Sequence, residues 1–293
     1  FCLIICLLRN KFADYLKLSD PAPNPLNIRK IHKVSTPLIG GVACYVSLVS
    51  SVGYSFFFLE NINLKFYLLL TFLMTIFLIL GVLDDKKDLT PLVKSTILVF
   101  SLFILIPLDQ DLIIKNLEFK YFIDRPIILN QAGLVFTIFC LYLFYNTLNF
   151  SDGANGIANS LSIYWVFMLI YKQNDYEIFL YTLLISLLII LFFNLRKKLF
   201  LGNSGASMIS VIIGILYIKI YSTKSTLFSD EIFMYFLFPG IDVIRVVTER
   251  ILNKKSPFYA DNTHLHHYLM KSFNQNFIWI PYIMLSIIPA LLM

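Results

Sequence analysis

Long apolar runs, separated by short polar or charged intervals, make up most of this chain. Nine runs approach the roughly 20 residues that one bilayer crossing needs, at 37–58, 64–83, 92–108, 127–148, 156–171, 176–195, 204–221, 232–247 and 277–293. A shorter run, FCLIICLL, precedes Arg9 and Lys11, and we interpret it as the end of a membrane helix whose beginning is missing. The pattern predicts an all-α, polytopic membrane helix bundle of about ten segments, forming one integral-membrane domain over residues 1–293.

Composition supports the membrane class and excludes a water-soluble domain. The chain has 293 residues, of which 58% are hydrophobic and only 14% charged. Its net charge of +6 is expected from cytoplasmic loops beside acidic lipid head groups, so we expect a bilayer and no nucleic acid as partner. All four cysteines lie in apolar runs without a C-x-x-C pair, as is typical of small buried hydrophobic residues.

The distribution of basic residues predicts the orientation. Of the 24 Lys and Arg residues, seventeen lie in one alternating set of loops. The other set holds seven: Lys65, Lys115, Lys120, Arg125, Lys172, Lys219 and Lys224. By the positive-inside rule the first set is cytoplasmic. The same side holds LDDKKDL, NTLNFSDGANG, FLGNSGAS and HLHH, so these stretches are predicted to meet in an active-site cleft at the cytoplasmic face.

The first polar stretch places three carboxylates between two apolar runs. Asp84, Asp85 and Asp88 stand beside Lys86 and Lys87. A carboxylate at the bilayer centre costs at least ~2.5–3.5 kcal/mol, so this cluster belongs at a helix end or in a wet cavity. An ordinary charged cytoplasmic turn is the alternative interpretation.

The second stretch combines amides with two turn dipeptides. Asn146 and Asn149 are three residues apart and share a helix face, and an amide within an apolar helix needs a partner. Asp152-Gly153 and Asn155-Gly156 are typical of turns. The alternative, a turn between two membrane helices with Asn as cap, explains the glycines well and Asn146 poorly.

A glycine-rich turn, GNSG at 202–205, opens a membrane helix in the third stretch. Such a turn presents free N–H groups and the positive end of the helix dipole, which suit a phosphate group. Capping of the helix by Asn203 or Ser204 is an equally good local explanation.

Three of the four histidines form the fourth stretch. If Asp261 or Thr263 caps a short helix, His264 and His267 share a face and His266 points elsewhere. No cysteine or second histidine pair supports a metal site. We therefore favour ligand contact through charge or hydrogen bonds, with a solvated cluster as the alternative.

Together these stretches resemble the polyprenyl-phosphate N-acetylhexosamine-1-phosphate transferases, the bacterial membrane family that includes phospho-MurNAc-pentapeptide translocase. The resemblance covers nearly the whole chain and is carried by NIRKIHKVSTPLIGG, LDDKKDL, NTLNFSDGANGI and the segment from PGIDVIR to THLHHYLM. The H-x-H-H form is similar to the amino-sugar branch rather than the pentapeptide branch. Two residues depart from the family pattern: Asn203 and Asn155 stand where Asp is usual.

The resemblance implies an enzyme of the bacterial inner membrane that transfers sugar-1-phosphate from a UDP-N-acetylhexosamine to polyprenyl (undecaprenyl) phosphate and releases UMP. This is the first membrane step of cell-envelope glycan synthesis. It implies Mg²⁺, with Mn²⁺ as an alternative, because two anionic reactants need a bridging cation. The implied residues are Asp84, Asp85 and Asp152 for catalysis; Asn149 and Asn203 for the metal; and Lys33, Asn146, Gly153, Asn155, Arg245, His264, His266 and His267 for substrate.

Two other functions stay open at this point. One is a phospho-MurNAc-pentapeptide transferase. The other is a catalytically disabled relative that acts as a transporter or scaffold, for which Asn203 would be the sign. A transporter favours ionisable groups near the bilayer centre, whereas the polar stretches here lie on one side. The sequence also leaves open whether the protein forms a homodimer.

Overall fold

The computed structural model describes residues 1–21, 35–59, 62–172, 176–224, 226–256 and 263–292. The chain forms two compact units, each assembled from two separate segments. The first unit contains Phe1–Leu89 and Ser162–Ile212, and the second contains Thr90–Leu161 and Ile213–Met293. Helices α7 (Ile157–Lys172) and α9 (Gly202–Thr223) contribute residues to both units.

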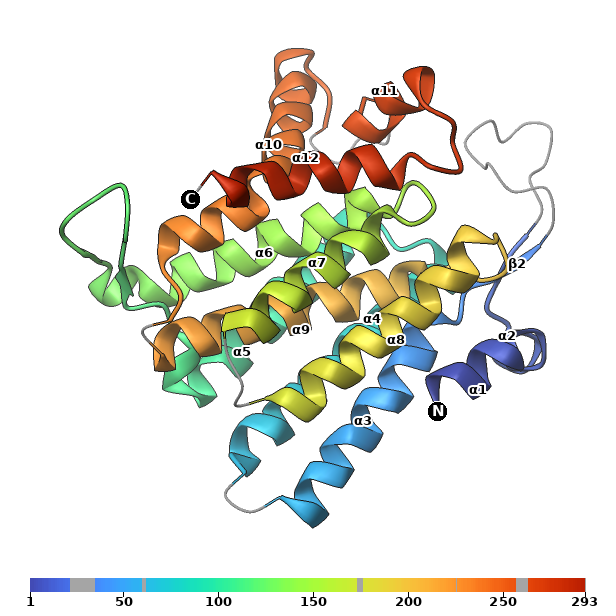
Figure 1. The fold of residues 1–293 in the computed structure, drawn as a ribbon, viewed down its shortest axis with the longest axis horizontal. Coiled ribbons are helices and arrows are strands. Elements are labelled where there is room, and N and C mark those ends of the chain that lie inside the picture. The colour runs from blue at the N-terminus through green and yellow to red at the C-terminus, as the bar shows by residue number, and fades with distance from the viewer. Residues whose placement is uncertain (22–34, 60–61, 173–175, 225, 257–262, 293) are drawn as a thin grey trace. The chain divides into compact units, whose positions relative to one another are not determined.

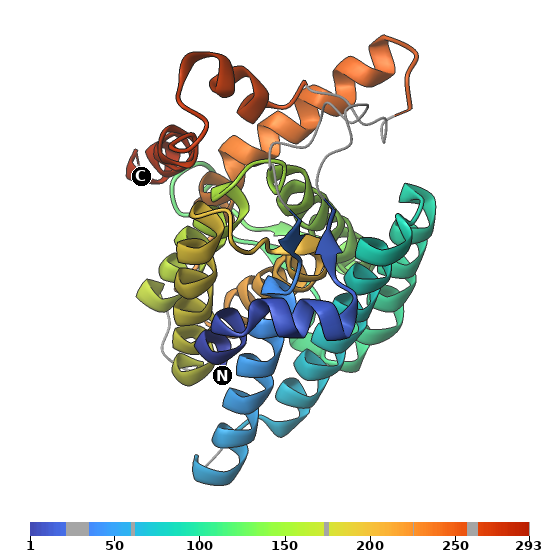
Figure 2. The same ribbon diagram turned by 90° about the vertical axis from the view of Figure 1, so that its right-hand side faces the viewer.

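In the first unit, α3 is the helix around which the others pack. The unit contains α1 (Cys2–Leu7), α2 (Arg9–Leu16), α3 (Gly40–Phe58), α4 (Leu64–Lys87) and α8 (Glu177–Leu195). Helix α3 packs along α8, α4 and α1 (Figure 1). Two short antiparallel strands, β1 (Ser19–Asp20) and β2 (Thr36–Pro37), pair beside them, with Ser19 opposite Pro37 (Figure 2).

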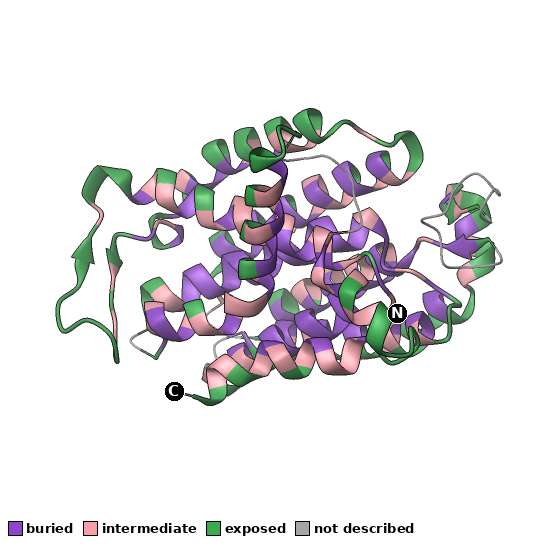
Figure 3. Ribbon diagram, turned by 90° about the horizontal axis from the view of Figure 1, so that it is seen from above, coloured by how far each residue is buried: buried purple, intermediate pink, exposed green. Residues whose placement is uncertain are grey.

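In the second unit, α10 (Ser229–Leu252) packs on both α12 (Trp279–Leu291) and α6 (Gly133–Ser151). Helix α6 also packs on α5 (Pro91–Leu105). The remaining elements are η1 (Ile106–Leu108), η2 (Gln110–Leu112), β3 (Asn116–Leu117), β4 (Ile127–Ile128), η3 (Asn130–Ala132) and α11 (Leu265–Ser272). Strands β3 and β4 form an antiparallel hairpin whose residues are mostly exposed (Figure 3).

Local sequence explains where several helices begin and end. Thr90 caps α5 by accepting the N–H of Val93, and Pro91 occupies the first helical position, where its missing N–H costs nothing. Asn63 caps α4 in the same way. Helix α4 ends at Lys87 and is followed by the C-cap residue Asp88, which adopts the left-handed conformation with φ of 52°.

Six helices in the described part of the chain are long and apolar enough to cross a membrane. They correspond to the predicted runs at 37–58, 64–83, 92–108, 127–148, 176–195 and 204–221. The predicted count of about ten is not confirmed, because α7 and α12 are short. Helix α10 is long, but its charged residues exclude it from the six. The run at 127–148 begins as strand β4, and its helix starts only at Gly133.

The position of Lys219 differs from the prediction, because the count of basic residues that predicts the orientation placed Lys219 in a loop. It lies inside α9, 2% exposed, with its Nζ atom 2.8 Å from carboxylate oxygens of both Asp109 and Asp111. A buried ammonium group needs such pairing to offset its lost hydration. Asp109, which precedes η2, and Asp111 within η2 therefore hold the end of α9 within the second unit.

Candidate functional site

In the first unit, the Asp85 carboxylate binds the beginning of α9. Its Oδ1 accepts the N–H of Asn203 at 2.9 Å, and its Oδ2 accepts the N–H of Ser204 at 3.1 Å. The first N–H groups of a helix have no partner within the helix and carry partial positive charge. A carboxylate from α4 therefore satisfies two of them and adds a favourable charge–dipole interaction.

Glycines allow α4 to approach α9 closely enough for this contact. Gly81 lies one helical turn before Asp85, and a Cβ atom there would be 2.3 Å from the Cα of Ser204. Gly202, with φ of +75°, starts α9 in a conformation that other residues rarely adopt. The backbone at Gly81 and Gly202 thus sets the position of the carboxylate.

This geometry answers both interpretations of the GNSG stretch. The N–H groups of Asn203 and Ser204, which we expected to be free for phosphate, donate to Asp85 instead. Capping by the side chain of either residue is also wrong, because α9 begins at Gly202 and both residues lie inside the helix. The cap comes from a residue far away in sequence.

Asp84 has a different local role, at the end of α4. It is 5% exposed, and its Oδ1 accepts the N–H of Leu89 at 2.9 Å. The two adjacent aspartates thus bind backbone N–H groups of different segments. Their placement at a helix end agrees with the expectation from the cost of burying carboxylates.

In the second unit, the amides of NTLNFSDGANG lie at the end of α6. The Nδ2 atoms of Asn146 and Asn149 donate to the carbonyls of Tyr142 and Tyr145, each at 2.8 Å. The partner that Asn146 was expected to need is therefore its own helix. Since both contacts use the amide nitrogen, each Oδ1 can serve as a neutral oxygen ligand.

The histidine stretch differs from the expected helix. Helix α11 begins at Leu265, so His264 is its N-cap residue, and Asp261 lies outside the described residues. The rings of His264 and His266 are parallel within 4°, with centroids 5.7 Å apart. The predicted pairing of His264 with His267 on one helix face is therefore wrong, because His264 precedes the first helical residue.

His266 is the most buried histidine of the three, at 2% exposure. Its Nε2 has no hydrogen-bond partner among the described residues. That atom faces Gly153, where an added Cβ would lie 2.6 Å away. Burial, and then the nearby His267 and His264, lower the pKa of His266 to about 3, so the ring is neutral at physiological pH.

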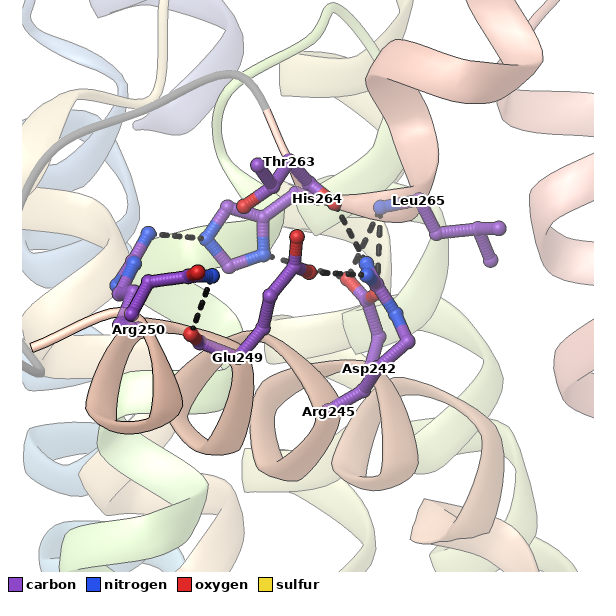
Figure 4. A network of polar contacts seen from close by, with 8 residues as sticks. Asp242, Arg245, Glu249, Arg250, Thr263, His264 and Leu265 are labelled. Atoms are coloured by element: carbon purple, nitrogen blue, oxygen red, sulfur yellow. Dashed lines mark hydrogen bonds and ion pairs between the residues drawn. The ribbon is translucent and has the colours of Figure 1, made fainter.

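A network of charged residues on α10 holds the backbone just before α11 (Figure 4). Asp242 accepts Arg245 Nη2 at 2.7 Å, the Nδ1–H of His264 at 3.2 Å and the N–H of Leu265 at 3.2 Å. Arg245 also donates to the Thr263 carbonyl at 2.6 Å and, through Nη1, to Glu249 at 3.2 Å. Two side chains on one face of α10 thus fix residues 263–265.

The ring of His264 is held from both of its nitrogens. Its Nε2 lies 3.4 Å from the Arg250 guanidinium, which can only donate. The Nε2 atom must therefore accept, and Nδ1 carries the proton that Asp242 receives. The ring also packs at 5.1 Å between centroids on Phe150, the neighbour of Asn149.

Each unit brings together part of the predicted site. The first holds Asp84, Asp85 and Asn203; the second holds Asn146, Asn149, Asp152, Gly153, Asn155, Arg245, His264, His266 and His267; and Lys33 lies outside the described residues. Sequence reasoning missed Asp242 and Arg250. The available signal was an ionisable residue inside the apolar run at 232–247, which by itself suggests a role.

The described residues contain no group of three His, Cys, Asp or Glu side chains that could hold a metal ion. Asp85 and Asn203 nevertheless lie together in the first unit, where the Asp85 carboxylate binds the backbone of Asn203. Carboxylate and amide oxygens are the hard ligands that Mg²⁺ prefers, and it retains several waters besides. The chemistry of these two side chains therefore suits Mg²⁺.

Comparison with known proteins identifies the family. The sequence profile described as glycosyl transferase family 4 matches residues 66–221, which is more than half of the chain. The chain belongs to glycosyl transferase family 4. The matched part of this family 4 transferase includes LDDKKDL, NTLNFSDGANG and GNSG.

Individual relatives of this family 4 transferase share one name, undecaprenyl-phosphate alpha-N-acetylglucosaminyl 1-phosphate transferase. The Escherichia coli K12 protein is 23% identical over 257 residues, covering 84% of this chain and 68% of the relative. The Haemophilus influenzae protein is 26% identical over 278 residues, with coverages of 91% and 75%. The Pasteurella multocida protein is 27% identical over 258 residues, with coverages of 84% and 70%. The family and these names indicate a glycosyl-1-phosphate transferase.

Proposed function

We propose that this protein transfers N-acetylhexosamine-1-phosphate from a UDP-sugar to a polyprenyl phosphate, releasing UMP, as the first membrane step of cell-envelope glycan synthesis. The observation that carries this proposal is the shared name of the relatives, which align with 84% or more of the chain. That name specifies the lipid phosphate and the amino sugar of those proteins. It also favours the amino-sugar reaction over the pentapeptide reaction.

The reaction explains why polar residues are needed at helix ends. An oxygen of the lipid phosphate attacks the β-phosphorus of the UDP-sugar, the bond from that phosphorus to the bridging oxygen breaks, and UMP leaves with the electron pair. Both reactants are anionic and repel each other, so positioning and charge neutralisation dominate catalysis. A lipid phosphate lies at head-group depth, which places its partners at helix ends rather than at the bilayer centre.

Each predicted residue except Arg245 has a role in this proposal. Asp84, Asp85 and Asp152 act on the reacting phosphates, and Lys33 binds phosphate. Asn146, Gly153 and Asn155 contribute to the nucleotide site, and the stretch from His264 to His267 forms part of the donor site. The side-chain oxygens of Asn149 and Asn203 would hold Mg²⁺, which when bound neutralises part of the diphosphate charge. Mn²⁺ would suit the same oxygens.

We also propose that the site faces the cytoplasm, in a cleft of the bacterial inner membrane. UDP-sugars are cytoplasmic, and the basic residues gather in one set of loops.

A donor panel tests the proposed function. Purified protein in detergent with undecaprenyl phosphate and Mg²⁺ should release UMP from one or more UDP-N-acetylhexosamines, with formation of lipid-linked sugar phosphate. UDP-MurNAc-pentapeptide serves as the alternative donor, and reactions without lipid control for simple hydrolysis. Turnover of the pentapeptide donor alone would establish the other branch. A protein that releases no UMP at any metal concentration would be a disabled relative.

Gly153 provides a prediction about the donor site. Gly153→Ala should reduce UMP release severalfold, because the new methyl group would lie 2.6 Å from Nε2 of His266 and must displace the ring. The matched control is Gly240→Ala in α10, where an added Cβ meets nothing within 4 Å. A helix gains roughly 0.5–1 kcal/mol from that control change, so it should remain active. Equal turnover by the two variants would show that the position of His266 is unimportant.

A further inference from the structure

We propose that Asp242 and Arg245 are positioning residues, which act on the sugar-nucleotide donor only through the histidine stretch that they hold. The inference rests on the proposed function for its substrate. Its geometric part rests on the contacts between α10 and residues 263–265. Asp242 is not among the site residues predicted from the sequence.

Asp242 binds the histidine stretch at two points and Arg245 of its own helix at a third. Its carboxylate accepts from Arg245, from the ring of His264 and from the N–H that opens α11 at Leu265. Asp242 is 6% exposed, so these bonds form away from bulk water, where charge-assisted hydrogen bonds are stronger. One carboxylate thus fixes both the start of the helix and the tautomer of the preceding histidine.

The Arg245 guanidinium already binds three acceptors. Its Nη2 binds Asp242 and the carbonyl of Thr263, and its Nη1 binds Glu249. A guanidinium that bridges a carboxylate and a backbone carbonyl in this way fixes the chain between them. We therefore assign Arg245 to holding residue 263 in place, rather than to the direct substrate contact that the family resemblance implied.

The contacts of Asp242 and Arg245 with residues 263–265 also determine where the His266 ring lies. His264 uses both ring nitrogens within the network, so it supplies a rigid surface rather than a ligand contact. His266 stacks parallel to it, and His267 lies at 4.2 Å between centroids from His266. The buried Nε2 of His266, which has no hydrogen-bond partner among the described residues, is thereby aimed at Gly153 of the DGANG turn. Loss of the contacts that Asp242 and Arg245 make with residues 263–265 would allow the His264 and His266 rings to reorient.

Asp242→Asn tests the inference with an isosteric change. The asparagine amide can still accept one N–H through Oδ1, but its Nδ2 would face an N–H donor. The negative charge of the Asp242 carboxylate is lost. We expect KM for the UDP-sugar to rise by about tenfold, and KM for the lipid phosphate to stay the same. The matched control is Glu249→Gln, which removes the negative charge from the exposed Arg245–Glu249 ion pair and changes none of the contacts to residues 263–265. Arg245→Lys keeps the charge but loses the bridge, and should raise the donor KM alone.

A second measurement does not depend on catalysis. Diethyl pyrocarbonate modifies accessible histidines, and mass spectrometry of the folded protein reports each site. His266 should react slowly in wild type and in Glu249→Gln, and severalfold faster in Asp242→Asn. Unchanged reactivity of His266 in both Asp242→Asn and Arg245→Lys overturns the positioning role, even if the wild type releases no UMP and the proposed function fails. If Asp242→Asn raises KM for the donor and KM for the lipid phosphate equally and also lowers the unfolding temperature, Asp242 only supports the fold.

Discussion

Asp85→Asn should lower the rate of UMP release by at least about tenfold, equivalent to about 1.4 kcal/mol of barrier. The same change should lower the unfolding temperature. In the wild type, both carboxylate oxygens accept N–H groups at the start of α9. An amide can accept through only one oxygen and would turn an N–H donor toward the other backbone N–H, which leaves a donor unsatisfied at a cost of roughly 1–3 kcal/mol.

Asp84→Asn is the matched comparison, because it removes a charge but preserves the local fold. Asp84 accepts the N–H of Leu89 through Oδ1, and an asparagine Oδ1 can do the same. We expect this variant to lose at least about tenfold in rate with an unchanged unfolding temperature. The lipid phosphate has a second pKa near 6 and is already largely ionised at neutral pH, so the loss would reflect positioning more than proton removal.

The pair is measured by steady-state UMP release alongside thermal unfolding in the same detergent. Full activity in both variants would remove the two aspartates from the site. A loss confined to Asp85→Asn, in proportion to its lower stability, would assign Asp85 to the start of α9 and leave no catalytic role for LDDKKDL. A loss in Asp84→Asn without a change in stability would support the chemistry directly.

The apolar pattern predicted the helices well where one run corresponds to one helix. The run at 176–195 became α8 with nearly the same bounds, because burial and lipid exposure both favour apolar residues along its whole length. The run at 127–148 failed at its start, since Ile127 and Ile128 form strand β4 opposite Asn116 and Leu117. Two apolar residues at the beginning of such a run carry no signal that separates a strand from a helix.

The pairings within the site could not be read from sequence, because they join distant residues. Asp85 and Asn203 lie 118 positions apart, so the local GNSG pattern suggested a free or self-capped helix start. His264 likewise looked like a helical residue, since the carboxylate that caps α11 belongs to Asp242, 23 positions before Leu265. The buried Lys219 likewise pairs with residues distant in sequence, Asp109 and Asp111. In each case a charge in or beside an apolar helix was the sign that a partner exists.

Asn203→Asp should lower the half-saturating Mg²⁺ concentration for UMP release by decades. Two unit charges 4 Å apart in an effective dielectric near 20 attract by roughly 4 kcal/mol, and the ion carries two charges. The wild type retains the Asn203 carbonyl oxygen and the nearby carboxylate of Asp85, so we expect it to be active but to require more Mg²⁺, or to prefer Mn²⁺. Asn203→Ala, which removes the oxygen, should shift the requirement in the opposite direction.

The position of Asp85 adds a measurement that does not require turnover. An aspartate at 203 would place a second negative charge beside a carboxylate that already binds the backbone of that residue. Without metal, repulsion between the two should lower the unfolding temperature, and Mg²⁺ should raise it again as the ion binds the folded state. The wild type should show a smaller response to Mg²⁺. If Asn203→Asp changes neither the metal dependence of UMP release nor this thermal response, the metal lies elsewhere and Asn203 serves only the start of α9. If the wild type is inactive at every metal concentration and Asn203→Asp restores UMP release, the asparagine has disabled this transferase.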